Sequence, residues 1–574
     1  MKKVVLIVTG ILLFQTNCFY DKNSNFIKRA LITYASALQR GGPGPTSVFY
    51  LNAPSNINAI PFAPDRINLT WHDNSDNETG FIIERSSGGD FIEITRTSED
   101  VTSHIDSEVT PGITYYYRLR SYNGAGDSDY SNVASAATVT SDLTRHYVRS
   151  EATGGNNGSD WTNAWVQLPA TLTRGHCYYI ADGTYPAYIF DDAVSGSVNI
   201  VIKKATADDH GTNTGWMSAY GDGTASFQPL RFTSSYYILD GQANRGIKIM
   251  GGYQGHIVSI LYSGVIIRNC ELDGNFVYDG AQNYQTDGAC TGIGIGDDTP
   301  WNSSFVTIEN CNIHNIADDG LQVYNSDHVY IKNNIVHDLH TCGTDAVLNG
   351  PCNNGHSDSM EIFNLRNSEI DSNFIYDSVT TNAALFFGDV AEQYGGYEVY
   401  CKNIRLTNNI FYTPEAGFVV YFDEADGIKA YNNIFWGRQD GRYGGVSIWR
   451  VYNLDMYNNI ILSIFYGHMG DVYNSAQHRG DYNLFGHVIT GAGEYQLKPN
   501  DIVNPNPGFI NNDIVNGATL ANPSAADFML LSSSPCIDSG YAGDANISIP
   551  LMDYPGTLRP QGDGIDRGAY EYGP

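Results

Sequence analysis

Two pairs of acidic residues are the strongest candidates for chemistry in this chain. Asp318 and Asp319 precede one short apolar segment, and Asp358 and Glu361 lie at the start of the next comparable segment. Oxygen-rich clusters of this kind bind Ca²⁺. Carboxylates that lie close together also need a cation or a proton, because each negative charge disfavours ionisation of its neighbour. If the two segments lie side by side, the sequence predicts one acidic site built from both pairs.

A simpler interpretation stays open for Asp319, because Gly320 follows it directly. Asp-Gly pairs favour turns, since the Asp side chain bonds to nearby backbone and Gly tolerates left-handed conformations. Asp273 and Gly274 are expected to form such a turn. On this interpretation Asp319 shapes the backbone and takes no part in chemistry.

Short alternating segments would present side chains around such a site. They read GIGIGD from Gly292, GLQVYN from Gly320, SMEIFN from Ser359, ALFFGD from Ala384 and GVSIWR from Gly445. Strand alternation sends successive side chains to opposite faces. It predicts an inward set, Ile293, Leu321, Met360 and Leu385. It also predicts an outward set, Gln322, Tyr324, Glu361, Phe363, Phe386, Ser447 and Trp449.

The outward set mixes aromatic rings with hydrogen-bonding groups, and this mixture suits the apolar faces and hydroxyl edges of sugar rings. We therefore predict that a glycan binds to Gln322, Tyr324, Phe363, Phe386 and Trp449. The alternative is that long loops simply cover these aromatic side chains.

A repeated phrase indicates how these segments are positioned. It reads IIRNCEL from Ile266, TIENCNI from Thr307, YIKNNIV from Tyr330, EIDSNFI from Glu369, RLTNNIF from Arg405, KAYNNIF from Lys429 and DMYNNII from Asp455. Repeats of this length predict stacked units, none of which can bury its apolar face alone. Matching positions then form inward apolar columns, which include Ile308, Ile331, Leu406 and Ile434.

The Asn residues of the repeated phrase are predicted to be structural. Asn tolerates the left-handed turn conformation and can form ladders of side-chain amides between stacked strands. The residues concerned are Asn310, Asn333, Asn408, Asn432 and Asn458.

Composition excludes several classes of function. The 574-residue chain has a net charge of −30 and an isoelectric point near 4.6, with 60 Gly, 40 Tyr and only 16% charged residues. Such a surface repels nucleic acid and anionic membranes. No HExxH or paired CxxC pattern occurs, so a zinc site is not expected.

The N-terminus indicates export. Lys2 and Lys3 precede the apolar run 4–14, which predicts a signal peptide over residues 1–18. The sequence FQTNC looks like a bacterial lipoprotein processing site with Cys18 as the lipidated residue. The chain is then either a surface lipoprotein or a secreted protein, and residues 19–51 form a tether.

Export permits disulfides. Cys342 and Cys352 bracket a Gly- and Asn-rich segment, and we predict that they pair. Cys270 and Cys311 occupy the same place in two copies of the repeat. Buried stacked thiols are the preferred interpretation for this second pair, and a bridge is the alternative.

Residues 52–139 have short strands separated by clusters of turn residues, as in an antiparallel sandwich. The segment resembles a fibronectin type III domain, and the residues that carry the resemblance are Pro54, Trp71, Tyr115–Tyr117, Leu119, Ser128, Tyr130 and Ser131. The resemblance implies a spacer or a weak glycan binder.

The segments His146–Tyr185 and Ser534–Tyr572 carry a second resemblance. They are similar to the entry and the closing segment of exported bacterial right-handed parallel β-helix proteins of the pectin-lyase-like class. The resemblance implies that residues 146–574 form one such β-helix with a C-terminal closing segment. The chain as a whole is then all-β, a fibronectin type III sandwich followed by a solenoid.

Pectin-lyase-like enzymes often cleave uronic-acid polymers by β-elimination, in which Ca²⁺ neutralises the carboxylate and a basic side chain removes a proton. By this resemblance Asp319, Asp358 and Glu361 are metal or substrate ligands, and Arg366 or His356 is the catalytic base. An Arg base requires strong local tuning of its very high pKa.

This sequence departs from the family pattern, because no lyase motif matches and the outward ribbon of these segments carries no Lys; Lys332 lies on the repeated-phrase strand, a different sheet. A glycoside hydrolase of the same fold would instead need two carboxyl groups, and Asp319 and Asp358 could serve.

We therefore expect an exported, monomeric carbohydrate-active protein whose partner is a polysaccharide or surface glycan, and which cleaves an acidic polysaccharide by Ca²⁺-assisted β-elimination. The alternative is a non-catalytic glycan-binding or adhesion protein. A base within hydrogen-bond reach of a Ca²⁺ ligand set would favour the enzyme.

Overall fold

The computed structural model describes residues 51–573 with internal gaps. The gaps are 64–65, 76, 98, 100, 111, 138–142, 252–254, 276–290, 298–302, 340–357, 377–382, 389–400, 415–417, 438–444, 468–478, 489–496, 505, 512–519, 521–522, 544–546 and 548. The predicted signal peptide with Cys18, the tether and the Cys342–Cys352 pair therefore lie outside the described residues. Within the described part of the chain, no helix is long and apolar enough to cross a membrane.

The first domain consists of two antiparallel sheets. One contains β1 (Ser55–Ala63), β2 (Arg66–His72) and β5 (Ser103–Asp106); the other contains β3 (Gly80–Ser86), β4 (Ile92–Arg96), β6 (Thr114–Asn123), β7 (Gly126–Asp127) and β8 (Ala134–Ala137). The predicted alternation is correct here, because Trp71, Tyr117 and Leu119 are buried in one apolar core. The hydroxyl of Tyr117 donates to Asp106 Oδ2 at 2.9 Å, so this buried polar group is paired.

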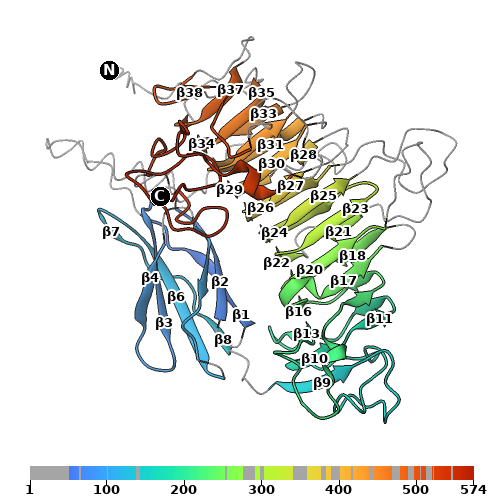
Figure 1. Ribbon diagram of the computed structural model, residues 1–574. Coiled ribbons are helices and arrows are strands. Elements are labelled where there is room, and N and C mark those ends of the chain that lie inside the picture. The colour runs from blue at the N-terminus through green and yellow to red at the C-terminus, as the bar shows by residue number, and fades with distance from the viewer. Residues whose placement is uncertain are drawn as a thin grey trace, which may run out of the picture. The chain divides into compact units, whose positions relative to one another are not determined.

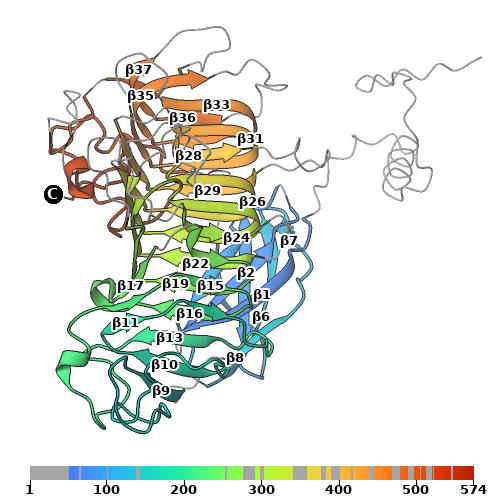
Figure 2. The same ribbon diagram turned by 90° about the vertical axis from the view of Figure 1, so that its right-hand side faces the viewer.

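The remainder of the chain is built from three long parallel sheets (Figures 1 and 2). In the early part of this region, successive strands enter different sheets, and each strand pairs with the strand three places later: β10 with β13, β13 with β16, and β16 with β19. One circuit of the chain therefore adds one strand to each sheet. Among the described residues, 3-10 helices accompany the sheets at η1 (Ser218–Tyr220), η2 (Ala243–Arg245) and η5 (Ala525–Phe528).

The first sheet contains β9 (Thr144–Val148), β10 (His176–Ile180), β13 (Ile200–Lys204), β16 (Tyr237–Asp240), β19 (Val265–Arg268), β22 (Ser304–Glu309), β29 (Cys401–Thr407), β34 (Asp455–Tyr457) and β36 (Arg479–Asp481). The second contains β11 (Gly183–Tyr185), β14 (Ala225–Phe227), β17 (Ile247–Met250), β20 (Cys270–Asp273), β23 (Asn312–Ile316), β25 (Ile335–Leu339), β27 (Phe374–Tyr376), β30 (Ile410–Thr413), β32 (Ile434–Gly437) and β38 (Ile502–Val503).

The third sheet contains β12 (Tyr188–Phe190), β15 (Leu230–Phe232), β18 (His256–Ile260), β21 (Thr291–Ile295) and β28 (Ala383–Gly388). Longer strands bend from the third sheet into the first: β24 (Leu321–Lys332), β26 (Met360–Asp371), β31 (Phe418–Tyr431) and β33 (Gly445–Tyr452). The strands β35 (Ile460–Gly467) and β37 (Leu484–Val488) join the second sheet to the third.

The predicted apolar columns are confirmed. Ile308 is in register with Ile331, and Ile370 of the next strand is in register with Leu406. All of these side chains are fully buried, and Ile434 is 1% exposed. Because each column continues from strand to strand, the units share one apolar core and no unit is stable alone.

Two neighbouring Asn positions in the repeated turn have different structural roles. The five predicted Asn residues all have positive φ, between 53° and 59°, as expected. Their side chains form isolated amide bonds, such as Asn310 Nδ2 to Asn269 Oδ1 at 2.6 Å and Asn458 Nδ2 to Asn432 Oδ1 at 3.4 Å. The continuous ladder is formed one position later, by fully buried Asn334, Asn373, Asn409, Asn433, Asn459 and Asn483.

Replacement of Asn334 by Ala is expected to destabilise the protein by about 2 to 3 kcal/mol, because buried partners lose their hydrogen bonds. Asn334 donates to Asn373 Oδ1 (3.0 Å) and to the Ile308 carbonyl (2.9 Å), and it accepts from the Cys311 N–H (2.9 Å). The matched control is Asn333→Gly, since Asn333 is exposed and Gly keeps its φ of 55°. Equal urea midpoints for the two variants would contradict the ladder assignment.

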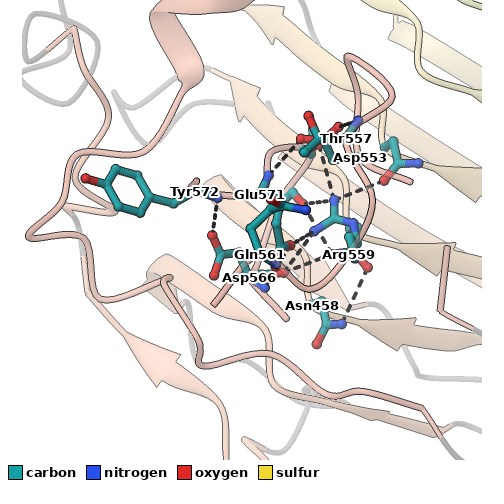
Figure 3. Close-up of polar contacts among 12 residues, drawn as sticks. Asn458, Asp553, Thr557, Arg559, Gln561, Asp566, Glu571 and Tyr572 are labelled. Atoms are coloured by element: carbon teal, nitrogen blue, oxygen red, sulfur yellow. Dashed lines mark hydrogen bonds and ion pairs between the residues drawn. The ribbon is translucent and has the colours of Figure 1, made fainter. Parts of the chain in front are cut away.

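The C-terminal segment packs against the sheets through a buried polar network (Figure 3). Arg559 Nη1 donates to Glu571 Oε2 at 2.7 Å, and both side chains are fully buried. The same guanidinium donates to Asn408 Oδ1 and to the carbonyl oxygens of Gly568 and Ala569. The C-terminal segment is thereby bonded to an Asn turn of the repeat at Asn408.

The described cysteines are unbridged. Cys177, Cys270, Cys311, Cys401 and Cys536 are all free and buried. The prediction of stacked thiols at Cys270 and Cys311 is therefore confirmed, and burial raises the pKa of the Cys270 thiol well above its usual value.

Candidate functional site

The third sheet carries a groove on its outer face. Its volume is about 780 Å³, and its lining includes Arg231, His256, Gly294, Gln322 and Tyr324. These residues come from β15, β18, β21 and β24, four neighbouring strands of one sheet. Successive strands of a sheet lie about 4.8 Å apart, so the groove runs across the strands and presents a new set of side chains at each step.

Four carboxyl groups gather at the β24–β26 end of this groove, as the sequence predicts. Gln322 Nε2 donates both to Asp319 Oδ2 (3.0 Å) and to Glu361 Oε2 (2.7 Å). The hydroxyl of Tyr324 donates to the same Glu361 oxygen at 3.1 Å. Asp319, Asp358 and Glu361 are at most 5% exposed. Gln322 therefore holds two carboxyl groups from neighbouring strands against each other.

Two of the three Asp residues of the cluster, Asp319 and Asp358, also shape the backbone. Asp319 Oδ1 accepts from the Asp358 N–H at 2.8 Å, and Asp358 Oδ1 accepts from the Ala383 N–H at 2.6 Å. Each side chain thus fixes the start of the strand on the next level. One Asp319 oxygen thus accepts from the backbone of the next strand rather than from its own turn, and the other faces Gln322. Gly320 is not among the glycines with positive φ, so the turn interpretation of Asp319 is not confirmed.

Burial and the neighbouring carboxylates favour the protonated forms of Asp318 and Asp319. Burial and the neighbouring charge of Glu361 raise the pKa of Asp318 to about 7. The same two causes, with Asp318 and Asp358 adding to them, raise the pKa of Asp319 well above its usual value. A buried carboxyl group that keeps its proton at neutral pH can act as a general acid.

Replacement of Asp318 by Asn is expected to stabilise the protein at pH 8. Because folding raises the pKa of Asp318, the folded state holds a proton that the unfolded state releases between about pH 4 and pH 7, and stability falls as the pH rises through this window. A fully buried group would contribute ~4 kcal/mol, and partial exposure reduces the expected gain to about 2 kcal/mol. Urea unfolding at pH 4 and pH 8 measures it; an equal effect at both pH values would contradict the protonation.

The predicted aromatic ribbon is present on the same face. Tyr324 stacks on Phe363 with 5.1 Å between ring centroids, Phe363 meets Phe386 edge-on at 5.8 Å, and Phe386 stacks on Tyr421 at 5.4 Å. Tyr324, Phe363 and Phe386 are half-buried, whereas the predicted inward residues below them are fully buried. Trp449 lies on β33 opposite Asp423, and its side chain is outside the described part of the structure.

Of the two predicted bases, only Arg366 lies within the described residues, and the structure does not bring it to the cluster. His356 lies outside the described residues. Arg366 lies beyond a corner of β26 at Asn364, whose φ is 53°. The strand passes there from the third sheet to the first, so the register neighbours of Arg366 are Asp327 and Lys402. The alternation of side chains along the strand is interrupted at this corner, so the direction of Arg366 cannot be predicted by counting residues from Glu361.

The groove is also lined by polar and charged side chains that were not predicted from the sequence. His256, Ser259 and Arg231 line it, and the first two lie in the strand HIVSI directly before the first copy of the repeated phrase. Arg231 is opposite Ser259 in the register of β15 and β18. The alignment of outward positions began at β21. If it had included the two preceding strands of the third sheet, β18 and β15, it would have identified these residues.

Within the described residues, a three-ligand arrangement suited to a metal ion occurs at Glu271, Asp273 and His314, away from the predicted ligands. Lys248 Nζ lies 2.9 Å from Glu271 Oε1 and 2.8 Å from Asp273 Oδ2. Bonds from His314 and Lys248 lower the pKa of Glu271 to about 2. The ammonium group therefore supplies the positive charge that this cluster needs.

Comparison with known proteins concerns the first domain. A model of the family "Fibronectin type III domain" matches residues 52–137. These residues form a fibronectin type III domain. It includes β1 to β8, and its boundaries agree closely with the predicted 52–139. The match covers a small part of the chain and leaves the three parallel sheets unassigned.

Individual relatives also match only short stretches. An amylopullulanase of Thermoanaerobacterium thermosulfurigenes is 34% identical over 86 residues, which is 15% of this chain and 4% of that protein. A solved Fn3-like protein from Clostridium thermocellum covers 14% of this chain and 86% of its own, at 24% identity and a TM-score of 0.13. A β-1,2-glucanase from Parabacteroides distasonis covers 17% of this chain and 14% of its own, at 23% identity and a TM-score of 0.15.

Proposed function

We propose that this chain is an exported carbohydrate-active protein that binds a polysaccharide in the groove and cleaves it at the carboxyl cluster. The observation that carries the proposal is the pair Asp319 and Glu361, held by one Gln322 amide at the end of a groove of about 780 Å³. The relative named amylopullulanase and the structure titled β-1,2-glucanase agree with a carbohydrate substrate.

The fold suits a repeating substrate. We propose that the three parallel sheets belong to a right-handed parallel β-helix of the pectin-lyase-like class. Strands about 4.8 Å apart repeat on nearly the same scale as the sugar units of a polysaccharide. Half-buried Tyr324, Phe363 and Phe386 offer apolar surface to sugar faces, and Gln322 and Arg231 offer hydrogen bonds to hydroxyl edges.

Hydrolysis is the cleavage reaction that the cluster supports most directly. The Asp319 carboxyl group, which burial keeps protonated, donates its proton to the glycosidic oxygen. Glu361, held by Gln322 and Tyr324, stabilises the positive charge that develops on the sugar or activates water. Hydrolysis needs one carboxyl group that carries a proton, and burial and the neighbouring carboxylates raise the pKa of Asp319 in that direction.

The β-elimination expected from the family resemblance is the second candidate. Oxygen atoms of Asp319 and Glu361 converge on one point, now occupied by the Gln322 amide, and hard oxygen ligands suit Ca²⁺. Asp358, with one oxygen already on Ala383, would complete the set. Bound Ca²⁺ would neutralise a uronate carboxylate. In this reaction His256, rather than the distant Arg366, is the base within the groove.

One assay separates these functions. The full chain is incubated with uronate and neutral polysaccharides, with added Ca²⁺ or with chelator. New reducing ends without ultraviolet absorbance report hydrolysis, and new absorbance that chelator removes reports Ca²⁺-dependent β-elimination. Binding without either product would identify a non-catalytic glycan-binding or adhesion protein, anchored through Cys18 or secreted. Absence of both binding and products across the panel would overturn the proposal.

A further inference from the structure

A second reactive arrangement lies in the groove beside the carboxyl cluster. Ser259 Oγ is 3.3 Å from His256 Nδ1, and both side chains belong to β18. His256 Nε2 is 3.3 Å from Gln322 Oε1 on β24, two strands away. The imidazole ring thus spans β21, where Gly294 leaves room for it: a Cβ at Gly294 would lie 2.7 Å from the His256 ring.

The neighbouring hydrogen bonds fix the roles of these atoms. Gln322 directs its amide nitrogen to Asp319 and Glu361, whose oxygens accept, so its own oxygen must face His256. An amide oxygen only accepts, and His256 Nε2 must therefore carry the hydrogen. In the neutral ring, Nδ1 is then the free base, and it faces the hydroxyl of Ser259.

The surroundings keep this base available and supply a positive charge. Desolvation in the groove is the main cause that lowers the pKa of His256, and the charge of Arg231 adds to it. Arg231 lies opposite Ser259 on the neighbouring strand, and its side chain is exposed to the groove. A nucleophile, a base, an orienting amide and a cation beside the nucleophile are the parts that acyl transfer requires.

We propose that Ser259 and His256 form a second catalytic centre, which hydrolyses acyl esters carried on sugar hydroxyl groups. Ester hydrolysis at this centre does not require that the protein cleaves a polysaccharide. Only the assignment of a sugar as the alcohol part of the ester rests on the proposed function. A groove that bound an acylated polysaccharide would bring its esters past Ser259 on the way to the carboxyl cluster, three strands further along the sheet.

The reaction balances without a cofactor. Ser259 Oγ attacks the ester carbonyl as His256 Nδ1 takes its proton, and Arg231 stabilises the negative oxygen that forms. The C–O bond to the sugar then breaks, and the sugar hydroxyl leaves with the proton held by His256. Water, deprotonated by His256, attacks the acyl-serine, and release of the carboxylic acid restores the Ser259 hydroxyl.

The test uses the full chain and a fluorophosphonate probe, with peptide mapping of the adduct. One probe per chain is expected on Ser259. Ser259→Ala and His256→Asn are expected to reduce both labelling and hydrolysis of p-nitrophenyl acetate at least about 100-fold. The control Ser226→Ala, on β14 of the second sheet, should match the wild type. Gln322→Leu tests the positioning role: kcat should fall about tenfold with KM unchanged, since this small ester does not reach Gln322.

The outcomes are distinct from those of the polysaccharide assay. Labelling of Ser259 in a protein that neither binds nor cleaves any polysaccharide would support the esterase centre and reject only the sugar-binding role of the groove. No adduct on Ser259, or full p-nitrophenyl acetate hydrolysis by Ser259→Ala, would overturn the proposal whatever the polysaccharide assay shows. Acetate released from an acetylated polysaccharide by the wild type, and not by Ser259→Ala, is the result expected with the natural class of substrate.

Discussion

The Glu361→Gln variant is expected to cleave polysaccharide at least about 100-fold more slowly than the wild type, because general acid–base and charge-stabilising groups contribute factors of this order. Gln keeps the size of the side chain and an oxygen that can accept from Gln322 and Tyr324. The loss should therefore appear in turnover, with an unchanged circular dichroism spectrum. Initial rates of product formation on a substrate found in the polysaccharide panel measure it.

The matched control is Glu309→Gln, a substitution of the same kind on β22 of the first sheet, where Glu309 lies opposite Lys332. It should retain the wild-type rate. Asp358→Ala is a poorer test, because it also leaves the buried Ala383 N–H without its acceptor and is expected to destabilise the strand. If Glu361→Gln kept full activity, cleavage would have to occur elsewhere, and the Trp449 end of the ribbon would be the next candidate.

Arg559→Met is expected to destabilise the protein by about 3 to 5 kcal/mol, because removing one partner of a buried ion pair leaves an uncompensated charge. Glu571 would lose its 2.7 Å partner, and the carbonyl oxygens of Gly568 and Ala569 would lose a donor (Figure 3). Urea unfolding followed by circular dichroism measures the loss.

Two controls make this result specific. Lys402→Met removes an ion pair with Asp426 in which Nζ and Oδ2 are 3.7 Å apart and the Lys side chain is about half exposed. The expected loss in the free energy of unfolding is therefore at most about 1 kcal/mol. Arg559→Met combined with Glu571→Met should recover part of the stability, because Glu571 is then no longer left as a buried charge without its partner. Equal losses in the single Arg559 and Lys402 variants would show that the C-terminal segment does not fasten the sheets.

The features that could be predicted from the sequence are those that depend on the alternation of side chains along a straight strand. Ile308, Ile331 and Leu406 are buried as predicted, and Gln322 and Glu361 meet because they occupy matching positions on adjacent strands. The carboxyl cluster follows from the same register. Each of these predictions uses a straight run of strand, in which the direction of a side chain follows from counting residues.

The errors arise where the backbone departs from a straight strand. Asn364 turns β26 into another sheet and carries Arg366 away from Glu361. The amide ladder lies on Asn334 and its equivalents because the preceding Asn takes the left-handed conformation and leaves the next side chain pointing inward. The role of His256 could not be predicted because its ring crosses β21 to contact Gln322, two strands away. This contact is possible only because residue 294 is Gly and has no Cβ to block the ring.

The most direct test of polysaccharide binding in the groove is a crystal structure of the Glu361→Gln variant with an oligosaccharide of a polysaccharide that the wild type cleaves. We expect electron density for sugar rings along the third sheet, from Arg231 past Gln322 to Phe386, with a glycosidic oxygen within hydrogen-bond reach of Asp319. Density confined to the fibronectin type III domain or to another sheet, with the groove empty, would contradict it.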